Sequence, residues 1–184
     1  MKRRGSLSIV SKHHKVIFLD RDGVINKAPI LPSGALGSPA TLEQFHLKEG
    51  ILPFCGAAKQ RGFGLIVFTN QPEVSRGNFI MEDMIEIEGF CRKRLGLLDY
   101  FACYHDDDDN CDCRKPKPGM LNMAATKWDL IFDECLLIGD REKDIRAGRS
   151  AGIFSILLEN HLFNSRNCCA DAYIEEINGA LRFL

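Results

Sequence analysis

Two carboxylates that stand two residues apart, Asp20 and Asp22, follow a short apolar run and precede Gly23. A carboxylate can attack phosphorus and form an acyl phosphate, while a second carboxyl group can protonate the leaving alkoxide and later deprotonate water. Gly23 would allow a tight turn that points both acids inward. Such a pair by itself is more often a solvated turn or a cation site, so it only suggests phosphoryl transfer.

A second pair of acids, Asp140 and Asp144, follows another apolar run, which ends at Gly139. Mg²⁺ prefers oxygen ligands and usually retains waters. Asp20 and Asp140 could therefore bind Mg²⁺ together with a backbone carbonyl and a phosphate oxygen. Asp144 lies about one helical turn beyond Asp140 and could orient that ligand or a metal-bound water, although an ordinary acid in the first turn of a helix explains it equally well.

Neutral and cationic side chains that suit phosphate occur in two further segments. Thr69, Asn70 and Gln71 supply a hydroxyl and two amides that can hold phosphate oxygens without adding negative charge, although the triplet alone would be a capping turn. Lys115 could neutralise charge on a transferring phosphoryl group. Arg114 could bind a phosphate or a substrate oxygen with two hydrogen bonds.

Three thiols and one imidazole lie within eleven residues, at Cys103, His105, Cys111 and Cys113. They match the number and the types of ligand in a closed tetrahedral Zn²⁺ site, which would be structural rather than catalytic. Such a site would fix the loop that leads directly into Arg114, and reduced surface thiols are the alternative. The acidic run 106–109 inside the loop is most simply a solvated turn, and it could also strengthen the attraction of cations.

Alternating strands and helices are expected to position these residues. Strands are predicted by apolar runs at 15–20, 64–69 and 135–139, with weaker candidates at 100–104 and 153–158. Helical patterns occur at about 51–61, 82–95, 119–128, 143–151 and 172–181. This alternation predicts right-handed crossovers and a mainly parallel sheet covered on both faces, with ligands at the carboxyl ends of the strands.

Two segments fall outside this alternation. Residues 27–49 contain several prolines and glycines, are too irregular for a helix, and predict a loop or small flap over the same edge of the sheet. Residues 1–14 lack apolar periodicity and are interpreted as a flexible segment. Residues 15–184 are then expected to form a single domain with a zinc-binding loop at about 103–113.

The composition of the 184-residue chain is that of an ordinary globular protein. Apolar residues make up 45% and charged residues 27%, which excludes wholesale disorder, and the formal net charge of −1 gives no basic track for nucleic acid. No apolar run approaches the ~20 residues of a membrane-spanning helix, and no signal-peptide core follows the basic start. These features, with the uneven clustering of eight cysteines, favour reduced thiols and a cytoplasmic monomer that binds a small phosphorylated metabolite.

Not every cysteine has an expected role in a metal site. Cys55, Cys91 and Cys135 stand among apolar neighbours, where a free cysteine behaves as a small hydrophobic residue. Cys168 and Cys169 have no assigned role.

The ordered set of motifs resembles that of the haloacid dehalogenase-like phosphatases. The matching segments are 20–26, 69–71, 111–116 and the Gly139–Asp140 pair with Asp144. More narrowly, the set looks like the branch that contains the heptose bisphosphate 7-phosphatases and the histidinol-phosphate phosphatases. The resemblance covers about residues 15–160, and it implies a Rossmann-like three-layer α/β sandwich without a large cap domain, a Mg²⁺-dependent phosphomonoesterase reaction and a structural zinc.

The resemblance also implies roles for individual residues. Asp20 would be the nucleophile that becomes the aspartyl phosphate. Asp22 would protonate the leaving sugar oxygen and then activate water, with its backbone carbonyl facing the metal, and Asp140 would complete the protein's metal ligands. Thr69 and Lys115 would hold the phosphoryl group. The substrate-binding residues would be Asn70, Gln71, Arg114 and Arg141.

The features that point to a substrate within this branch disagree. Residues 114–120 and the Arg76–Gly77 pair resemble the heptose enzymes, whereas the five residues between His105 and Cys111 resemble the histidinol-phosphatase version. The expected reaction is removal of the 7-phosphate of D-glycero-D-manno-heptose 1,7-bisphosphate in nucleotide-heptose biosynthesis. Histidinol phosphate or another sugar phosphate is the alternative, and a nucleic-acid 3′-phosphatase or a non-catalytic zinc- or phosphate-binding module is less favoured.

Overall fold

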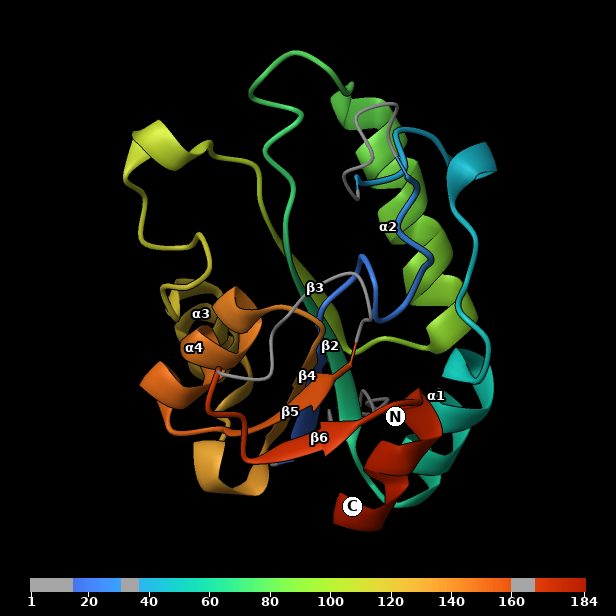
Figure 1. Cartoon of the computed structure of the whole chain (residues 1–184), viewed down its shortest axis with the longest axis vertical. Helices are drawn as coiled ribbons and strands as arrows, with labels where there is room; N and C mark the ends of the chain where they lie inside the picture. Colours follow the sequence, from blue (N-terminus) through green and yellow to red (C-terminus); the bar gives the residue numbers. More distant parts are fainter. Residues whose placement is uncertain (1–14, 31–36, 160–167) are drawn as a thin grey trace, which may run out of the picture.

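The computed structural model describes residues 15–30, 37–159 and 168–184, so the interpretation of residues 1–14 lies outside it. Its centre is a six-stranded sheet with the strand order β3-β2-β1-β4-β5-β6, in which every neighbouring pair is parallel (Figure 1). The strands are β1 (Val16–Leu19), β2 (Gly64–Asn70), β3 (Asp99–Cys103), β4 (Leu136–Gly139), β5 (Phe154–Leu158) and β6 (Ala172–Ile174).

The central strands are short apolar runs because both of their faces are covered. Every residue of β1, β2 and β4 is buried. In the sheet, Leu19 of β1 pairs with Val67 of β2 on one side and with Ile138 of β4 on the other. This register aligns the carboxyl ends of the three strands, so the polar residues that follow them come together at one edge of the sheet.

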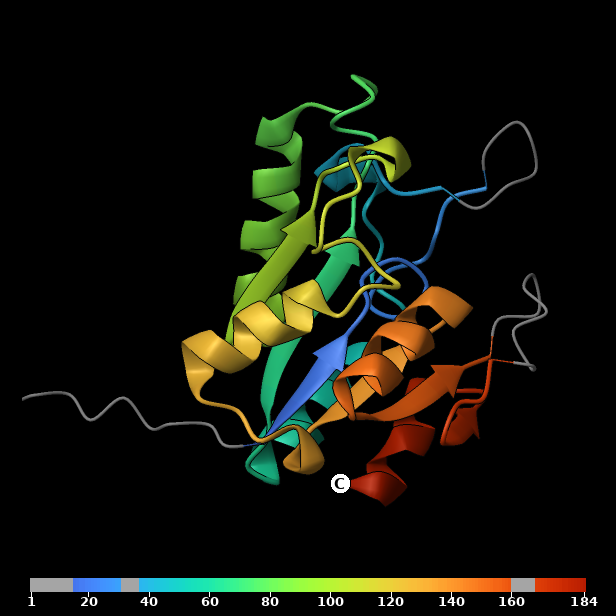
Figure 2. The same cartoon turned by 90° about the vertical axis from the view of Figure 1, so that its left-hand side faces the viewer.

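Within the described ranges, four α-helices cover the sheet in two layers: α1 (Ile51–Gln60), α2 (Met81–Leu95), α3 (Gly119–Trp128) and α4 (Glu142–Ala151). Side chains of α1 and α2 enter one apolar core, and those of α3 and α4 enter a second core on the opposite face (Figure 2). Short 3-10 helices complete the described elements: η1 (Leu42–Gln44), η2 (Asp107–Asp109), η3 (Phe132–Glu134) and η4 (Ile177–Phe183). The predicted three-layer arrangement is therefore present.

The predicted helix at 172–181 is wrong. Residues Ala172–Ile174 form the edge strand β6, and the 3-10 helix η4 begins only at Ile177. The alternating burial of β6, with Tyr173 outward between two buried residues, is the period-two pattern of a strand. Three residues are too few to reveal that period in the sequence, and pairing with β5 decides the conformation.

The described parts of the 27–49 segment lie over the carboxyl end of β1, as expected of a loop at this edge. Asn26 forms an antiparallel bridge with Leu47, and the hydroxyl of Ser38 donates to Asp22. The segment between β1 and α1 also contains the three-residue helix η1, and the backbone N–H of Lys48 donates to the carbonyl of Ile25 at 2.8 Å. No helix in the described ranges combines the length and apolar character that crossing a membrane requires.

The cysteines with no predicted metal role lie mostly inside the protein. Cys55 and Cys91 belong to the core beneath α1 and α2, and Cys135 belongs to the opposite core, which agrees with their interpretation as small hydrophobic residues. Cys168 is also buried, whereas Cys169 is exposed. All eight cysteines are in the described ranges and form no disulfide there.

Candidate active site

A cavity of about 410 Å³ opens at the carboxyl ends of the central strands. Asp20 and Asp22, which follow β1, line it together with Thr69 near the end of β2. The backbone N–H of Asp20 donates to the carbonyl of Ile138 in β4, at 3.0 Å, so the chain is still attached to the sheet where the first acid projects. The parallel topology therefore brings together residues that are 49 positions apart in sequence.

Three buried carboxylates, from Asp20, Asp140 and Asp144, gather beside this cavity. Each offers an oxygen, and these oxygens lie within 4.8 Å of one another. The ammonium of Lys115 lies 2.6 Å from Oδ1 of Asp20 and 2.7 Å from Oδ1 of Asp144. Burial, reinforced by the charge of Asp144, raises the pKa of Asp20 although Lys115 opposes the shift.

The donor set of this cluster fits a divalent cation. Three buried carboxylates lie close together, and the Lys115 ammonium contacts two of them, those of Asp20 and Asp144. Hard carboxylate oxygens are the ligands that Mg²⁺ takes in proteins. Asp144, expected beyond the direct ligands, is in the cluster itself, where its second oxygen accepts from the backbone N–H of Arg141 at 3.0 Å.

Gly23 is required for the close approach of Asp140. Its φ of +92° is in the left-handed region that favours glycine, and a Cβ there would collide with the Asp140 carboxylate. The turn that the sequence predicts after Asp22 therefore also contacts Asp140, a candidate metal ligand that directly follows β4.

Asp22 is held apart from the three-carboxylate cluster by four polar side chains. Arg21, Gln71, Asn26 and Ser38 donate to its two oxygens over 2.7–3.0 Å. Burial alone would raise the pKa of Asp22, but the charge of Arg21 and these hydrogen bonds lower it. The carboxylate is thus oriented and held in its charged form at the cavity wall.

The Thr69–Gln71 triplet divides into residues that reach the cavity and one that supports them. Thr69 and Asn70 line the cavity, and the Asn70 amide makes two hydrogen bonds to the backbone of Lys115, at 3.0 and 3.1 Å. Gln71, predicted to bind substrate, is fully buried, does not line the cavity, and donates to Asp22 and Thr69. The Gln71 amide therefore contacts two residues of the cavity wall, and its predicted contact with substrate stays a prediction.

Four cationic side chains line the cavity. Arg114 and Arg141 are predicted site residues, whereas Lys143 in α4 and Arg76 in the loop after β2 were not predicted to contact substrate. Burial, together with the charge of Lys115, lowers the pKa of Lys143. Four carboxylate side chains line the same cavity, so its wall offers partners for an anionic group as well as for a cation; they are those of Asp20, Asp22, Glu73 and Asp107.

A family model for haloacid dehalogenase-like hydrolases matches residues 34–152 of this chain. A D-glycero-β-D-manno-heptose-1,7-bisphosphate 7-phosphatase of Helicobacter pylori is 35% identical over 151 residues, covering 79% of this chain and 83% of the relative. The chain belongs to the haloacid dehalogenase-like hydrolases. A D-glycero-α-D-manno-heptose-1,7-bisphosphate 7-phosphatase of Burkholderia mallei is 34% identical over 157 residues, covering 79% of each protein.

A solved structure supports the same fold for this haloacid dehalogenase-like hydrolase. The D,D-heptose 1,7-bisphosphate phosphatase of B. bronchiseptica, complexed with magnesium and phosphate, superposes with a TM-score of 0.77. Its sequence is 24% identical, and the match covers 92% of this chain and 97% of that chain. The predicted family, its Rossmann-like α/β fold and its assignment as an enzyme are confirmed.

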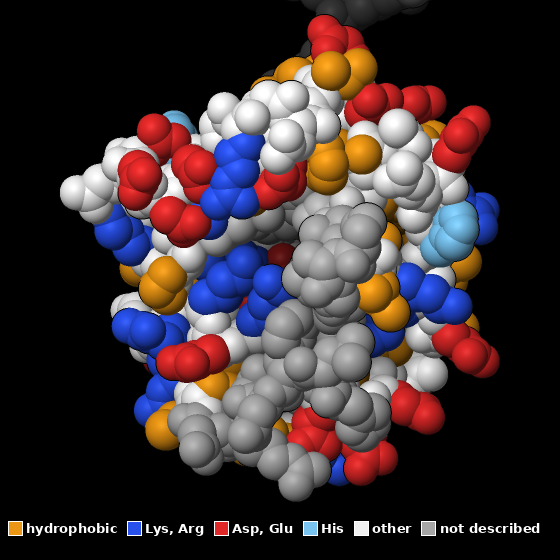
Figure 3. Space-filling view, turned by 45° about the horizontal axis from the view of Figure 1, so that its top comes forward, with side chains coloured by type: hydrophobic (Ala, Val, Ile, Leu, Met, Phe, Trp, Pro, Cys, Tyr) orange, Lys and Arg blue, Asp and Glu red, His pale blue; other side chains and the backbone are white. Residues whose placement is uncertain are grey.

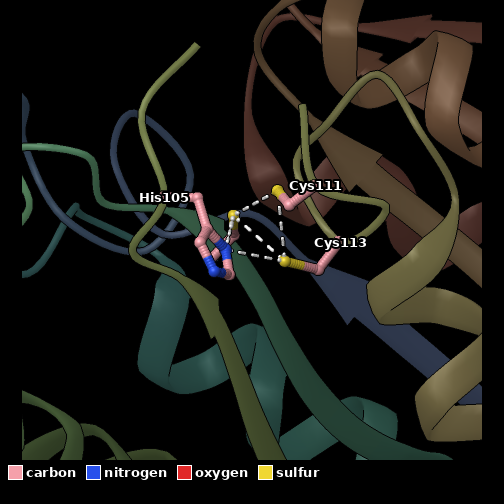
Figure 4. A group of neighbouring side chains, drawn as sticks. His105, Cys111 and Cys113 are labelled. Atoms are coloured by element: carbon pink, nitrogen blue, oxygen red, sulfur yellow. Dashed lines mark hydrogen bonds between the residues drawn. The ribbon is translucent and has the colours of Figure 1, made fainter. Parts of the chain in front are cut away.

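The predicted Cys and His ligands of this hydrolase converge at the end of β3 (Figure 4). Sulfur–sulfur distances among Cys103, Cys111 and Cys113 are 3.3–3.6 Å, and Nδ1 of His105 lies 3.3 Å from the Cys113 sulfur. Ligands about 2.0–2.3 Å from a tetrahedral Zn²⁺ are roughly 3.3–3.8 Å apart, so the four atoms have suitable spacing. The cluster immediately precedes Arg114, as the sequence predicts.

Sequence reasoning missed the supporting residues of this family member's site. Arg21 is 1% exposed and pairs with Asp22, and Asn26 is fully buried beside it. Both stand inside the 20–26 motif, so their position in the motif was an available signal. Ser38 and Lys48 come from the irregular loop, where Lys48 donates to the carbonyl of Gly23 at 2.7 Å, and no local pattern marks either.

Proposed function

We propose that this protein is a Mg²⁺-dependent phosphomonoesterase that removes the 7-phosphate of D-glycero-D-manno-heptose 1,7-bisphosphate through an aspartyl-phosphate intermediate. The main supporting observation is the buried cluster of Asp20, Asp140 and Asp144, two of which pair with the Lys115 ammonium, beside a cavity that Asp22 and cationic side chains line. The substrate is proposed because the relatives described above carry this activity in their names.

Asp20 is assigned as the nucleophile. Lys115 donates to its Oδ1, so we assign attack on phosphorus to Oδ2, which forms the acyl phosphate as the bond to the sugar oxygen breaks. The ammonium of Lys115 offsets negative charge in the transition state, and the Thr69 hydroxyl at the cavity wall can donate to a phosphate oxygen. Asp20, the backbone carbonyl of Asp22, and Asp140 would hold Mg²⁺, which supplies Lewis-acid stabilisation of the phosphoryl oxygens.

Asp22 is assigned as the general acid and base. Its lowered pKa suits the second step, in which it takes a proton from the water that attacks the aspartyl phosphate. In the first step it must instead deliver a proton to the leaving sugar oxygen. An approaching phosphate dianion favours that protonated form, because a like charge raises the pKa of a carboxyl group.

Arg114 and Arg141 are assigned to the part of the substrate beyond the transferred phosphate, and Asn70 to holding Lys115 in place. We also propose a structural Zn²⁺ on Cys103, His105, Cys111 and Cys113, which would fix the loop that carries Arg114. The eight cysteines, all free in the described ranges, are consistent with a cytoplasmic protein, and we propose that it acts as a monomer on a small phosphorylated metabolite.

The experiment that tests this function is phosphate release with Mg²⁺ from the α and β anomers of heptose 1,7-bisphosphate and from histidinol phosphate, at equal concentrations. Relatives of both anomer specificities match at similar identity, so both anomers are needed. The histidinol arm is included because five residues separate His105 from Cys111. We expect the largest kcat/KM with one heptose anomer, and a preference for histidinol phosphate would refute the proposed substrate.

Asp20→Asn is the blank for this assay. An amide is a poor nucleophile, so turnover should disappear while the far-ultraviolet circular dichroism stays that of the folded wild-type protein. Turnover by the folded Asp20→Asn protein would contradict the covalent mechanism, whichever substrate is preferred.

A further inference from the structure

One carboxylate of the acidic loop, that of Asp107 in η2, bridges two arginines at the mouth of the active-site cavity. Its Oδ1 accepts from Nε of Arg114 at 2.8 Å and lies 2.7 Å from Nη2, while its Oδ2 lies 3.3 Å from Nη2 of Arg76. All three residues line the cavity. In Figure 3, Lys and Arg side chains gather beside a hollow in the surface, with acidic side chains next to them.

The hydrogen bond from Nε of Arg114 and the ion-pair contact of Nη2 with Asp107 occupy the edge with which a guanidinium binds phosphate. Nε and Nη2 both point to the one carboxylate oxygen, and Nη1 donates to the backbone carbonyl of His105 at 3.1 Å. Among the described residues, Asp107 is the one carboxylate paired with Arg114. An anion that enters the cavity and binds this edge must therefore replace Asp107.

Displacement of Asp107 is feasible because the rest of the loop does not depend on its carboxylate. The side chain is 69% exposed, so water can solvate it once it leaves the arginines. Arg76 retains Asp106 and Glu73 as partners. The turn itself is closed by Asp106 and Asp109, which cap it through backbone N–H groups.

We propose that Asp107 is a specificity-determining residue, an internal competitor that occupies the arginine edge used by a second anionic group of the substrate. The inference rests on the proposed function in one respect, that the substrate has a phosphate besides the one transferred. A phosphate dianion carries more charge and more acceptor oxygens than a carboxylate, so it displaces Asp107 where a neutral hydroxyl group does not. Only the bisphosphate must break this ion pair, so Asp107 weakens bisphosphate binding and narrows the enzyme's preference for it over sugar phosphates that lack the second anion.

The test compares the wild-type protein with Asp107→Asn and with Asp108→Asn. Asp108 is an exposed neighbour for which no hydrogen bond or ion pair with a described residue is found, so it controls for loss of one negative charge in the same turn. The two substrates are heptose 1,7-bisphosphate and heptose 7-phosphate, which differ only in the second phosphate. The measured quantity is the ratio of their KM values in each variant.

Asp107→Asn should lower KM for the bisphosphate, relative to KM for the monophosphate, by about twofold to fivefold, as expected for loss of partly exposed ion-pair competition. Asp108→Asn should change the ratio by less than about 1.5-fold, because exposed charges without a partner interact weakly through water. A higher relative KM in Asp107→Asn would mean that Asp107 aligns Arg114 for binding, and an effect equal to that of Asp108→Asn would mean general electrostatics. Either result overturns the proposal.

Failure of the proposed function can be separated from failure of this inference. If the wild-type protein hydrolyses neither heptose phosphate, the proposed substrate is wrong. The same three proteins are then compared by inhibition of p-nitrophenyl phosphate hydrolysis with the two sugar phosphates. Stronger inhibition of Asp107→Asn by the bisphosphate alone supports the competitor role, and equal inhibition refutes it.

Discussion

Replacing Lys115 by methionine should destabilise the folded protein as well as stop turnover. The side chain is 1% exposed, and its ammonium pairs with Asp20 at 2.6 Å and with Asp144 at 2.7 Å. The ammonium also donates to the backbone carbonyl of Phe68 at 3.1 Å and lies 4.3 Å from the centre of the Phe68 ring. Methionine preserves most of the volume, so the main change is the loss of the only cation that contacts these two carboxylates in the described part of the chain.

The expected loss in the free energy of unfolding is about 3–5 kcal/mol, the cost of removing one partner from a buried ion pair. For a chain of this size it corresponds to a melting temperature roughly 6–20 °C lower. Urea denaturation followed by circular dichroism at neutral pH, without added Mg²⁺, measures it. Because the proposed mechanism assigns this ammonium to stabilising the transferring phosphoryl group, phosphate release should fall to the level of Asp20→Asn.

Lys117→Met is the matched control for this experiment. Lys117 lies two residues further along the same loop, but its side chain is 45% exposed and pairs at 3.4 Å with Asp112, which is 99% exposed. An exposed pair of this kind contributes ~0–1 kcal/mol. A loss below about 1 kcal/mol in Lys115→Met, or equal losses in the two variants, would refute the view that Lys115 balances a buried cluster.

Three further changes have distinct expected outcomes. Burial alone would raise the pKa of Asp99, but hydrogen bonds, led by that of Lys127, lower this pKa to about 2. The contribution of Asp99 to the free energy of unfolding is therefore complete above about pH 4 and is lost as the pH falls through 2. Asp99→Asn should lower the free energy of unfolding, measured with urea at pH 7, by about 1–2 kcal/mol. This is less than the energy that corresponds to the full pKa shift, because the cationic partners of Asp99 are partly solvated. A difference from wild type that does not shrink toward pH 2 would contradict this expectation. Gly23→Ala should reduce kcat at least about tenfold, since the new Cβ displaces Asp140, and unchanged kinetics would show that the turn tolerates the strain. Cys111→Ser should lower the bound zinc, measured by atomic absorption, from about one ion per chain, and should reduce activity because Arg114 becomes mobile. Purification of the wild-type protein without zinc would refute the proposed structural zinc site.

Much of the fold was accessible from the sequence because the buried strands are continuous apolar runs. The runs before Asp20 and Asp140 end in polar residues, and parallel pairing then places both acids at one edge of the sheet. β6 escaped prediction because a three-residue edge strand depends on its neighbour rather than on its own pattern. Local propensity is weakest where tertiary pairing supplies most of the stabilisation.

The roles within the candidate site were less accessible than its location. Gln71 belongs to a triplet whose composition suits phosphate, yet its side chain is turned into the protein toward Asp22. Asp144 could equally have been a helix-capping acid, and in the structure it both accepts from the backbone of Arg141 and pairs with Lys115. Side-chain direction decides these roles, and spacing along the chain does not contain it.

Hydrophobic periodicity and short motif spacings are local properties of the chain, so they already show which groups are available and at which strand ends they lie. How charge is shared among these groups depends on contacts between distant parts of the chain. Lys115 and Asp20 are 95 positions apart, and their contact at 2.6 Å exists because β2 lies beside β1 and Asn70, at the end of β2, binds the backbone of Lys115. Likewise, Asp107 becomes part of the cavity only when the loop after β3 folds back toward Arg76, since an ion pair requires proximity in space and no local pattern encodes that proximity.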